Sequence, residues 1–228
     1  MIAENIKRIN ELISLKCDQV GRKREDVVLI AVSKNNPVSS IVDVLKTGVI
    51  DFGENRANEL RDKYTELIEH KLNWHFIGGL QKNKVKYIIN ATKYIHSVES
   101  IGLAEEINKK AEAINKVQKV LIECNISNEV SKMGLIDSKE IWDLAEFIKG
   151  CSNLELKGLM TMAPYTDETT VIRKTFKGLK SVFDEMNRNN YSLTELSMGM
   201  TNDFEIGIEE GSTMLRIGTA IFGERVFL

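Results

Sequence analysis

Short apolar runs alternate with helical patterns from one end of the chain to the other, and this alternation limits the fold more than any other feature. Runs such as VVLIAVSK (27–34) are almost continuously apolar, which is typical of parallel strands that are buried on both faces. The segments between the runs carry apolar residues at helical spacing. Eight strands are expected, at residues 27–34, 49–53, 73–79, 94–98, 119–127, 156–162, 194–199 and 214–218.

Eight strands in strict alternation with helices predict one (β/α)8 barrel of the TIM type, a single domain over residues 1–228. A doubly wound open sheet produces the same alternation with fewer strands and is the structural alternative. An extra N-terminal helix carries Ile2, Ile6, Ile9 and Ile13 at helical spacing. Because no full-length helix follows the eighth strand, this opening helix is expected to take that place in the outer ring.

The charge and cysteine content exclude several classes of protein. Lys and Arg total 31 against 33 for Asp and Glu, and no basic cluster is interleaved with aromatic residues, so a nucleic-acid partner is not expected. Cys17, Cys124 and Cys151 are widely spaced, as in proteins of a reducing compartment. The N-terminus lacks the apolar core of a signal peptide, and no apolar run has the length of a membrane span. A cytoplasmic protein without a membrane partner is expected.

Barrel chemistry collects at the carboxyl ends of the strands, where three features stand out. Lys34 is the only charge in its strand; it has either simply reached solvent or is a desolvated amine suited to condensing with a carbonyl group. Gly218 and Thr219 form either a phosphate cradle or a tight turn. Arg216 lies within a strand and needs a carboxylate or a ligand acceptor as its partner. These residues predict a barrel for a phosphorylated ligand without naming the ligand.

The three histidines do not suggest a metal site. His75 lies between two aromatic residues, a setting more typical of a hydrogen-bonded core histidine than of a catalyst. His70 and His96 do not combine with it at metal-ligand spacing. No bound metal is therefore expected.

Eight short motifs, each weak alone, are highly specific as an ordered set. On them the chain resembles the YggS/PROSC family of pyridoxal-phosphate-binding proteins, over nearly its whole length. That family has the barrel of fold-type III enzymes, as in the N-terminal domain of alanine racemase. The motifs are AVSK (31–34), FGEN (52–55), WHFIGGLQKNK (74–84), HSVES (96–100), NISNEVSKMG (125–134), LKGLMTM (156–162), LSMGM (196–200) and EEGSTMLRIGTAIFG (209–223).

The resemblance implies pyridoxal 5′-phosphate as the cofactor, held as a Schiff base on Lys34 of AVSK. It also implies a phosphate site made by Ser197 of LSMGM together with Gly218 and Thr219 of RIGT.

The resemblance further implies that Arg216 faces the pyridine nitrogen of the cofactor, with Asn55 and His75 as contacts at the rim. A positive group at that nitrogen disfavours its protonation, so the ring is a weak electron sink and carbanion chemistry is suppressed. The expected function is intracellular vitamin B6 homeostasis without catalytic turnover, by a monomer. Pyridoxal-phosphate-dependent apo-enzymes are its candidate partners.

Two enzyme hypotheses stand beside this one. An amino-acid racemase needs a second base, which alanine racemase takes from the C-terminal domain of the other subunit. The chain ends just past the eighth strand, and Tyr165 is the one nearby tyrosine available as a substitute. A barrel enzyme acting on a phosphorylated sugar would need a carboxylate base at a strand end, for which Glu54 has the position.

Overall fold

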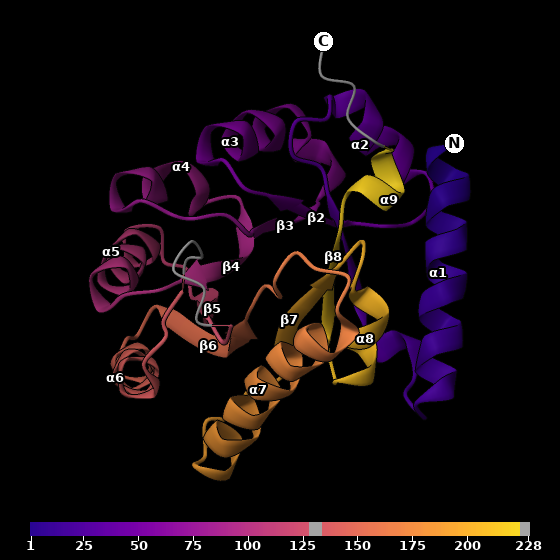
Figure 1. The fold of residues 1–228 in the computed structure, drawn as a ribbon. Helices are drawn as coiled ribbons and strands as arrows, with labels where there is room; N and C mark the ends of the chain where they lie inside the picture. The colour runs from indigo at the N-terminus through magenta and orange to yellow at the C-terminus, as the bar shows by residue number, and fades with distance from the viewer. Residues whose placement is uncertain (128–133, 224–228) are drawn as a thin grey trace.

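The computed structural model describes residues 1–127 and 134–223, which form a closed parallel barrel (Figure 1). The strands pair in sequential order, and β8 pairs with β1. This closure confirms the predicted (β/α)8 barrel and excludes the doubly wound sheet. The strands are β1 (Val28–Val32), β2 (Asp51–Glu54), β3 (Asn73–Phe76), β4 (Thr92–Val98), β5 (Gln118–Glu123), β6 (Leu154–Met160), β7 (Glu195–Met200) and β8 (Met214–Ile217).

Helices surround the barrel, and the N-terminal helix takes the place predicted for it. The α-helices are α1 (Ile2–Gln19), α2 (Val38–Leu45), α3 (Ala57–Glu66), α4 (Val85–Ile88), α5 (Ile101–Glu112), α6 (Ser138–Lys149), α7 (Thr169–Arg188), α8 (Phe204–Glu209) and α9 (Thr219–Phe222), with short 3-10 segments η1 (Arg24–Asp26), η2 (Ile68–His70) and η3 (Lys82–Lys84). Only the single turn of α9 follows β8 within the described residues. Helix α1 packs against α2, α8 and α9 and thereby completes the outer ring (Figure 1).

Apolar side chains pack in two layers, because successive strand residues point to opposite faces. A large cluster lies between the strands and the helices, and α1 contributes Ile6, Ile9 and Ile13 to it. A smaller cluster lies inside the barrel. Its buried members are Ile30, Tyr94, Leu121, Met160 and Met214.

The first strand ends earlier than its sequence pattern predicts. Strand β1 stops at Val32, and Lys34 lies in a turn. Asn35 has a φ of 61°, a left-handed conformation that ends an extended strand and that Asn tolerates better than most residues. Asn36 donates its side-chain N–H to the Lys34 carbonyl at 3.2 Å. Helix α2 begins directly after Pro37, and no side chain caps its first turn among the described residues.

Two other helix ends have a clear structural cause. Asp137 caps α6, since its carboxylate accepts the Lys139 backbone N–H at 2.8 Å. Helix α8 begins at Phe204, and Gly211 follows its end with a φ of 98°, a conformation that glycine adopts without strain. Residues 128–133 of the NISNEVSKMG motif lie outside the described residues. Among the described helices, none has the length and apolar content needed to span a bilayer.

Candidate functional site

A cavity of about 1100 Å³ opens at the carboxyl ends of the strands. Lys34, Asn55, Arg216, Gly218 and Thr219 all line it. Strands β1 and β8 are paired neighbours in the closed barrel. Lys34, which follows β1, and Gly218, which follows β8, therefore lie on the same side of the cavity. Barrel closure thus brings together residues from opposite ends of the chain.

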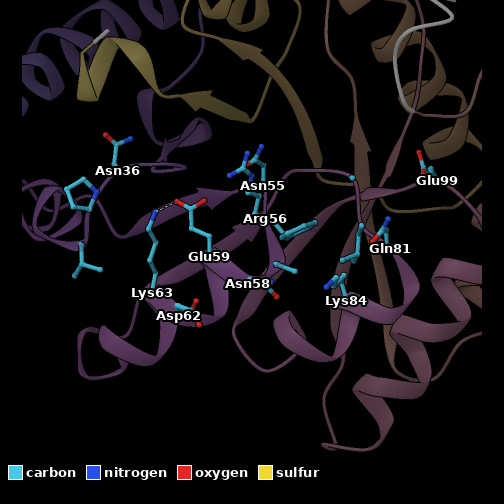
Figure 2. Close-up of a pocket in the computed structure, with 16 residues that line it drawn as sticks. Asn36, Asn55, Arg56, Asn58, Glu59, Asp62, Lys63, Gln81, Lys84 and Glu99 are labelled. Carbon is cyan, nitrogen blue, oxygen red and sulfur yellow. Dashed lines mark hydrogen bonds and ion pairs between the residues drawn. The ribbon is translucent and has the colours of Figure 1, made fainter. Parts of the chain in front are cut away.

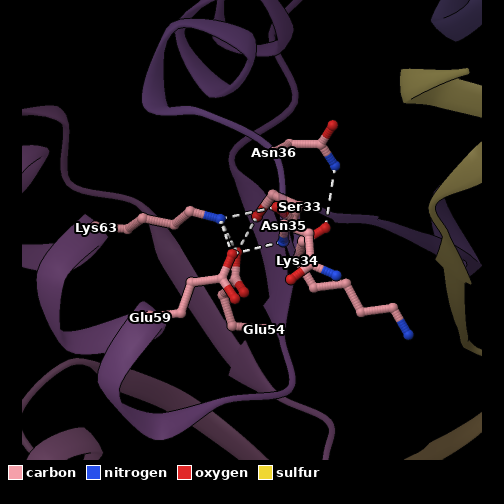
Figure 3. Close-up of polar contacts among 7 residues, drawn as sticks. All are labelled: Ser33, Lys34, Asn35, Asn36, Glu54, Glu59 and Lys63. Atoms are coloured by element: carbon pink, nitrogen blue, oxygen red, sulfur yellow. Dashed lines mark hydrogen bonds and ion pairs between the residues drawn. The ribbon is translucent and has the colours of Figure 1, made fainter. Parts of the chain in front are cut away.

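The Lys34 side chain is half-buried and lines the cavity. Figure 3 shows it pointing away from Lys63 and toward the C-terminal part of the chain, drawn in yellow. Its amine is therefore directed at the space that Arg216 and Gly218 also line.

Asn55 approaches the cavity next to a glycine that has no room for a side chain. A Cβ on Gly78 would lie 2.4 Å from the Asn55 carbonyl oxygen, so only glycine permits this close approach of the two segments. The Oδ1 atom of Asn55 is buried and has no hydrogen-bond partner among the described residues. A buried acceptor of this kind beside a cavity suits a ligand that donates a hydrogen bond.

Two threonines line the cavity where β7 and β8 end. Thr201 follows β7, and Thr219 follows Gly218 after β8. The two segments meet, since the Ala220 backbone N–H lies 3.5 Å from the Thr201 hydroxyl oxygen. Hydroxyl groups and backbone N–H groups are the neutral donors with which proteins bind phosphate oxygens.

Ser197 and His75, by contrast, are not among the described residues that line the cavity. Ser197 is fully buried and His75 is 1% exposed, because both side chains point into the barrel below the cavity. His75 is thus an interior residue and not the rim contact that the resemblance implies.

The interior side chains form a continuous hydrogen-bonded chain. His75 Nε2 lies 3.0 Å from Asp51 Oδ1, and His75 Nδ1 lies 2.9 Å from His96 Nε2. His96 Nδ1 lies 2.9 Å from Ser197 Oγ, which also contacts the Arg216 guanidinium. This series of hydrogen bonds runs from the amino end of β2 to the floor of the cavity.

One direction of donation satisfies every member of this chain when both histidines are neutral. Arg216 can only donate and Asp51 can only accept. Ser197 accepts from Arg216 and donates to His96, which donates from Nε2 to His75, which donates from Nε2 to Asp51. Burial lowers the pKa of His75 and lowers that of His96 well below its usual value, and the Arg216 charge acts on His96 in the same direction. The histidines are therefore neutral at physiological pH.

Arg216 is held by carbonyl groups as well as by Ser197. It is 4% exposed and donates to the Ser197 carbonyl at 2.8 Å and to the Thr161 carbonyl at 2.9 Å. Burial lowers its pKa to about 10, while Asp203 and Glu123 raise it, so the guanidinium remains charged at neutral pH. A cation fixed in this way can present its remaining N–H groups to a ligand.

Glu123 is an acidic residue on the cavity wall that the sequence predictions missed. Its pKa is raised to about 7, mainly by burial and also by the charge of Glu99, while the charge of Arg216 acts in the opposite direction. The signal was present in the sequence, because Glu123 interrupts the apolar run of β5. Thr201 was missed as well, although it directly follows the LSMGM motif. The described residues contain no group of three or more His, Cys, Asp or Glu side chains that could hold a metal ion.

Comparison with known proteins identifies the family. The model of the alanine racemase N-terminal domain matches residues 2–226. The pyridoxal phosphate homeostasis protein of Aquifex aeolicus is 41% identical over 225 residues, covering 98% of each chain. That of Escherichia coli K12 is 38% identical over 234 residues, covering 98% of this chain and 97% of the relative. The chain therefore belongs to the pyridoxal phosphate homeostasis proteins within the alanine racemase N-terminal domain family.

Solved structures agree with this assignment. PipY of Synechococcus elongatus PCC7942, solved with pyridoxal phosphate bound, has a TM-score of 0.86 at 30% identity, over 98% of this chain and all of that one. The alanine racemase of Clostridium difficile 630 has a TM-score of 0.74 at 17% identity, over 96% of this chain and 57% of that one. The racemase likeness shows the shared barrel alone.

Proposed function

We propose that this chain binds pyridoxal 5′-phosphate in the cavity at the carboxyl ends of the strands and forms a Schiff base with it on Lys34. The observation that carries the proposal is the convergence of Lys34, Arg216, Gly218 and Thr219 on one cavity. A primary amine condenses with an aldehyde, and the other groups suit a phosphorylated pyridine ring. PipY, a relative with the same barrel, is known with this cofactor bound.

We propose phosphate contacts that differ in one residue from those implied by the resemblance. Ser197 is buried, and its hydroxyl already contacts Arg216 and His96. Thr201 lines the cavity beside Gly218 and has a hydroxyl facing that segment. We therefore assign phosphate binding to Thr201, Gly218 and Thr219, and give Ser197 the task of orienting Arg216.

Arg216 supports the proposal that the cofactor is held without being used in turnover. When bound, pyridoxal phosphate supplies an electron-withdrawing ring whose power as an electron sink depends on protonation of the ring nitrogen. A guanidinium has no acceptor atom, so Arg216 can donate to that nitrogen but cannot support its protonation by accepting a hydrogen bond. The retained positive charge of Arg216 also opposes protonation, because a protonated ring nitrogen would place a second positive charge beside it.

The two enzyme hypotheses have less support. A racemase needs a second base, and Tyr165, the only tyrosine among the described cavity-lining residues, is 97% exposed. A phosphorylated-sugar enzyme needs an available carboxylate, whereas the fully buried Glu54 is hydrogen-bonded to Ser33 and Lys63 and is not among the described lining residues. Holding and supplying the cofactor, as a homeostasis protein, is the function that the site supports best.

The cellular context is part of the proposal. We propose a cytoplasmic monomer that exchanges pyridoxal phosphate with apo-enzymes that need it. The three cysteines are free thiols, which supports a reducing compartment.

Covalent trapping tests the proposed function. The purified protein mixed with pyridoxal phosphate should give the visible absorption band of a lysine-bound pyridoxal, and borohydride should fix a pyridoxyl group on the peptide that contains Lys34. Lys34→Ala should abolish both signals, because Lys34 is the only lysine among the described residues that line the cavity. Lys84→Ala, which removes an amine from a neighbouring groove, should leave both unchanged.

Two results would contradict the proposal. A colourless protein that binds phosphorylated sugars would favour a barrel enzyme. A pyridoxyl group on a lysine other than Lys34 in the unmodified protein would show that the central residue assignment is wrong.

A further inference from the structure

The turn that carries Lys34 is gripped on both sides of that residue. Ser33 precedes Lys34, and Asn35 follows it in a left-handed conformation, with a φ of 61°. The Asn36 backbone N–H donates to the Ser33 carbonyl at 3.0 Å and closes the turn. This turn, and not the regular geometry of β1, sets the direction of the Lys34 side chain.

Lys63 of α3 holds the Ser33 side of the turn. Its ammonium group donates to the Ser33 carbonyl at 2.8 Å and to carboxylate oxygens of Glu54 and Glu59 at 2.7 Å each. An ammonium group has three hydrogens, so these contacts use its full donor capacity. The Ser33 hydroxyl also donates to Glu54 at 2.6 Å.

Glu59 holds the Asn35 side of the turn. Its Oε1 atom accepts the Asn35 backbone N–H at 2.6 Å and the Lys63 ammonium at 2.7 Å. Figure 3 shows Glu54, Glu59 and Lys63, which we call the clamp, on one side of the turn, with the Lys34 side chain leaving on the other.

The clamp is unusually polar for its position behind a barrel strand. Lys63 is 6% exposed and Glu54 is fully buried, with an Oε2 atom that has no hydrogen-bond partner among the described residues. Burial raises the pKa of Glu54, which the Lys63 charge opposes. Apolar side chains of similar volume would often fill such a space at lower cost in stability. A buried charged group that is directed at the turn of a functional lysine suggests a role beyond packing.

We propose that the clamp positions Lys34, with Lys63 as its central positioning residue. The proposal rests on the proposed function, because it presumes that Lys34 bonds to the cofactor. The clamp fixes Ser33 and Asn35, so the Lys34 amine faces the cavity before any ligand arrives. This preorganisation favours the covalent bond without adding a contact to the ligand itself.

Two ligands distinguish a positioning role of the clamp from general damage to the binding site. Pyridoxal 5′-phosphate can bond to Lys34, whereas pyridoxine 5′-phosphate has an alcohol in place of the aldehyde and cannot. Lys63→Met removes the donors and keeps an unbranched side chain of similar length. Pyridoxal phosphate affinity should fall about tenfold, or about 1.4 kcal/mol, while pyridoxine phosphate affinity, measured by equilibrium dialysis, stays unchanged.

Matched variants control for loss of a lysine and for loss of charge. Lys84→Met, in the groove that Glu59 and Lys63 also line (Figure 2), should match the wild type for both ligands, because the contacts of Lys84 are to the Tyr87 ring and not to the turn. Glu59→Gln keeps an acceptor for the Asn35 N–H and should retain most of the pyridoxal phosphate affinity. Glu59→Ala should lose it about as far as Lys63→Met does.

The other possible outcomes would each contradict a stated part of the proposal. Unchanged affinity of Lys63→Met for both ligands, or an equal fall for both, would overturn the positioning role. Equal behaviour of Glu59→Gln and Glu59→Ala would remove Glu59 from it. A wild-type protein that fails to prefer the aldehyde contradicts the proposed function itself, and with it the clamp, before any variant is made.

Discussion

Two of the cationic side chains that line the cavity, Lys34 and Arg216, are held in opposite ways. Lys34 leaves a turn that is fixed from outside the barrel by the charged clamp of Glu54, Glu59 and Lys63. Arg216 is fixed from inside the barrel by carbonyl groups and by Ser197. Ser197 is in turn hydrogen-bonded to the two neutral histidines.

The difference matches the chemistry that each side chain is proposed to perform. A lysine that must form and break a bond needs a defined direction, which a clamp on its backbone supplies while its amine stays in the cavity. An arginine that must still donate to a ligand needs partners that orient it without occupying all of its N–H groups. Carbonyl and hydroxyl oxygens orient it, while the more distant carboxylate of Asp51 lies at the far end of the histidine chain.

Removal of the interior cation should have the largest effect on stability. Arg216→Met leaves the Ser197 and Thr161 carbonyls without their donor and leaves buried Glu123 without a neighbouring cation. We expect a loss of roughly 3–5 kcal/mol in the free energy of unfolding, measured by urea denaturation. The exposed Arg188→Met is the control, and a loss below about 1 kcal/mol would show that Arg216 is not embedded as described.

Glu123 should make the Arg216 side of the cavity pH-dependent. The pKa of Glu123 rises from its ordinary 4.5 to about 7 in the folded protein, so the folded state binds the extra proton between these values. Its stabilising contribution is complete below pH 4.5 and is lost as the pH rises through about 7.

Glu123→Gln should remove this dependence. Relative to the variant, the wild type should lose up to about 3 kcal/mol of unfolding free energy over that interval. Parallel stability profiles for the two proteins would contradict the assignment.

Interruption of the hydrogen bonds between the histidines should have a smaller effect on stability and should leave the Lys34 turn and its clamp intact. His96→Leu leaves His75 Nδ1 and the Ser197 hydroxyl without their buried partner, which should cost about 2 kcal/mol in unfolding free energy. Borohydride trapping on Lys34 should persist, because the clamp is untouched. The exposed His70→Leu serves as the control; loss of trapping in His96→Leu alone would show that the two sides are coupled.

Tyr165 should have the smallest effect. Its side chain is 97% exposed, so Tyr165→Phe should change neither the visible band nor the unfolding free energy beyond about 0.5 kcal/mol. If the unmodified protein exchanged the α-proton of alanine, measured by deuterium incorporation, and Tyr165→Phe abolished that exchange, the racemase hypothesis would be restored.

Local sequence patterns predicted the barrel well and its strand ends less well. The eight strands and the place of α1 follow from apolar spacing that is visible in the sequence. The end of β1 does not, because Ser33 and Lys34 continue the apparent run although the chain turns at Asn35. That turn depends on partners in α3, far along the chain, which no local pattern reveals.

The site residues show the same division between what the local sequence predicts and what it does not. Strand-end position selected Lys34, Arg216, Gly218 and Thr219, which all line the cavity. The resemblance added Ser197, whose strand and neighbours were known but whose inward direction was not.

By itself, then, the sequence determined the eight-fold alternation, the family and the presence of one lysine and one arginine at strand ends. Tertiary structure decided which groups meet. The clamp around the Lys34 turn and the histidine chain behind Arg216 both join segments that are distant along the chain. The physical reason is that apolar periodicity is encoded residue by residue, whereas hydrogen-bond partners across a barrel are set by closure, register and side-chain direction.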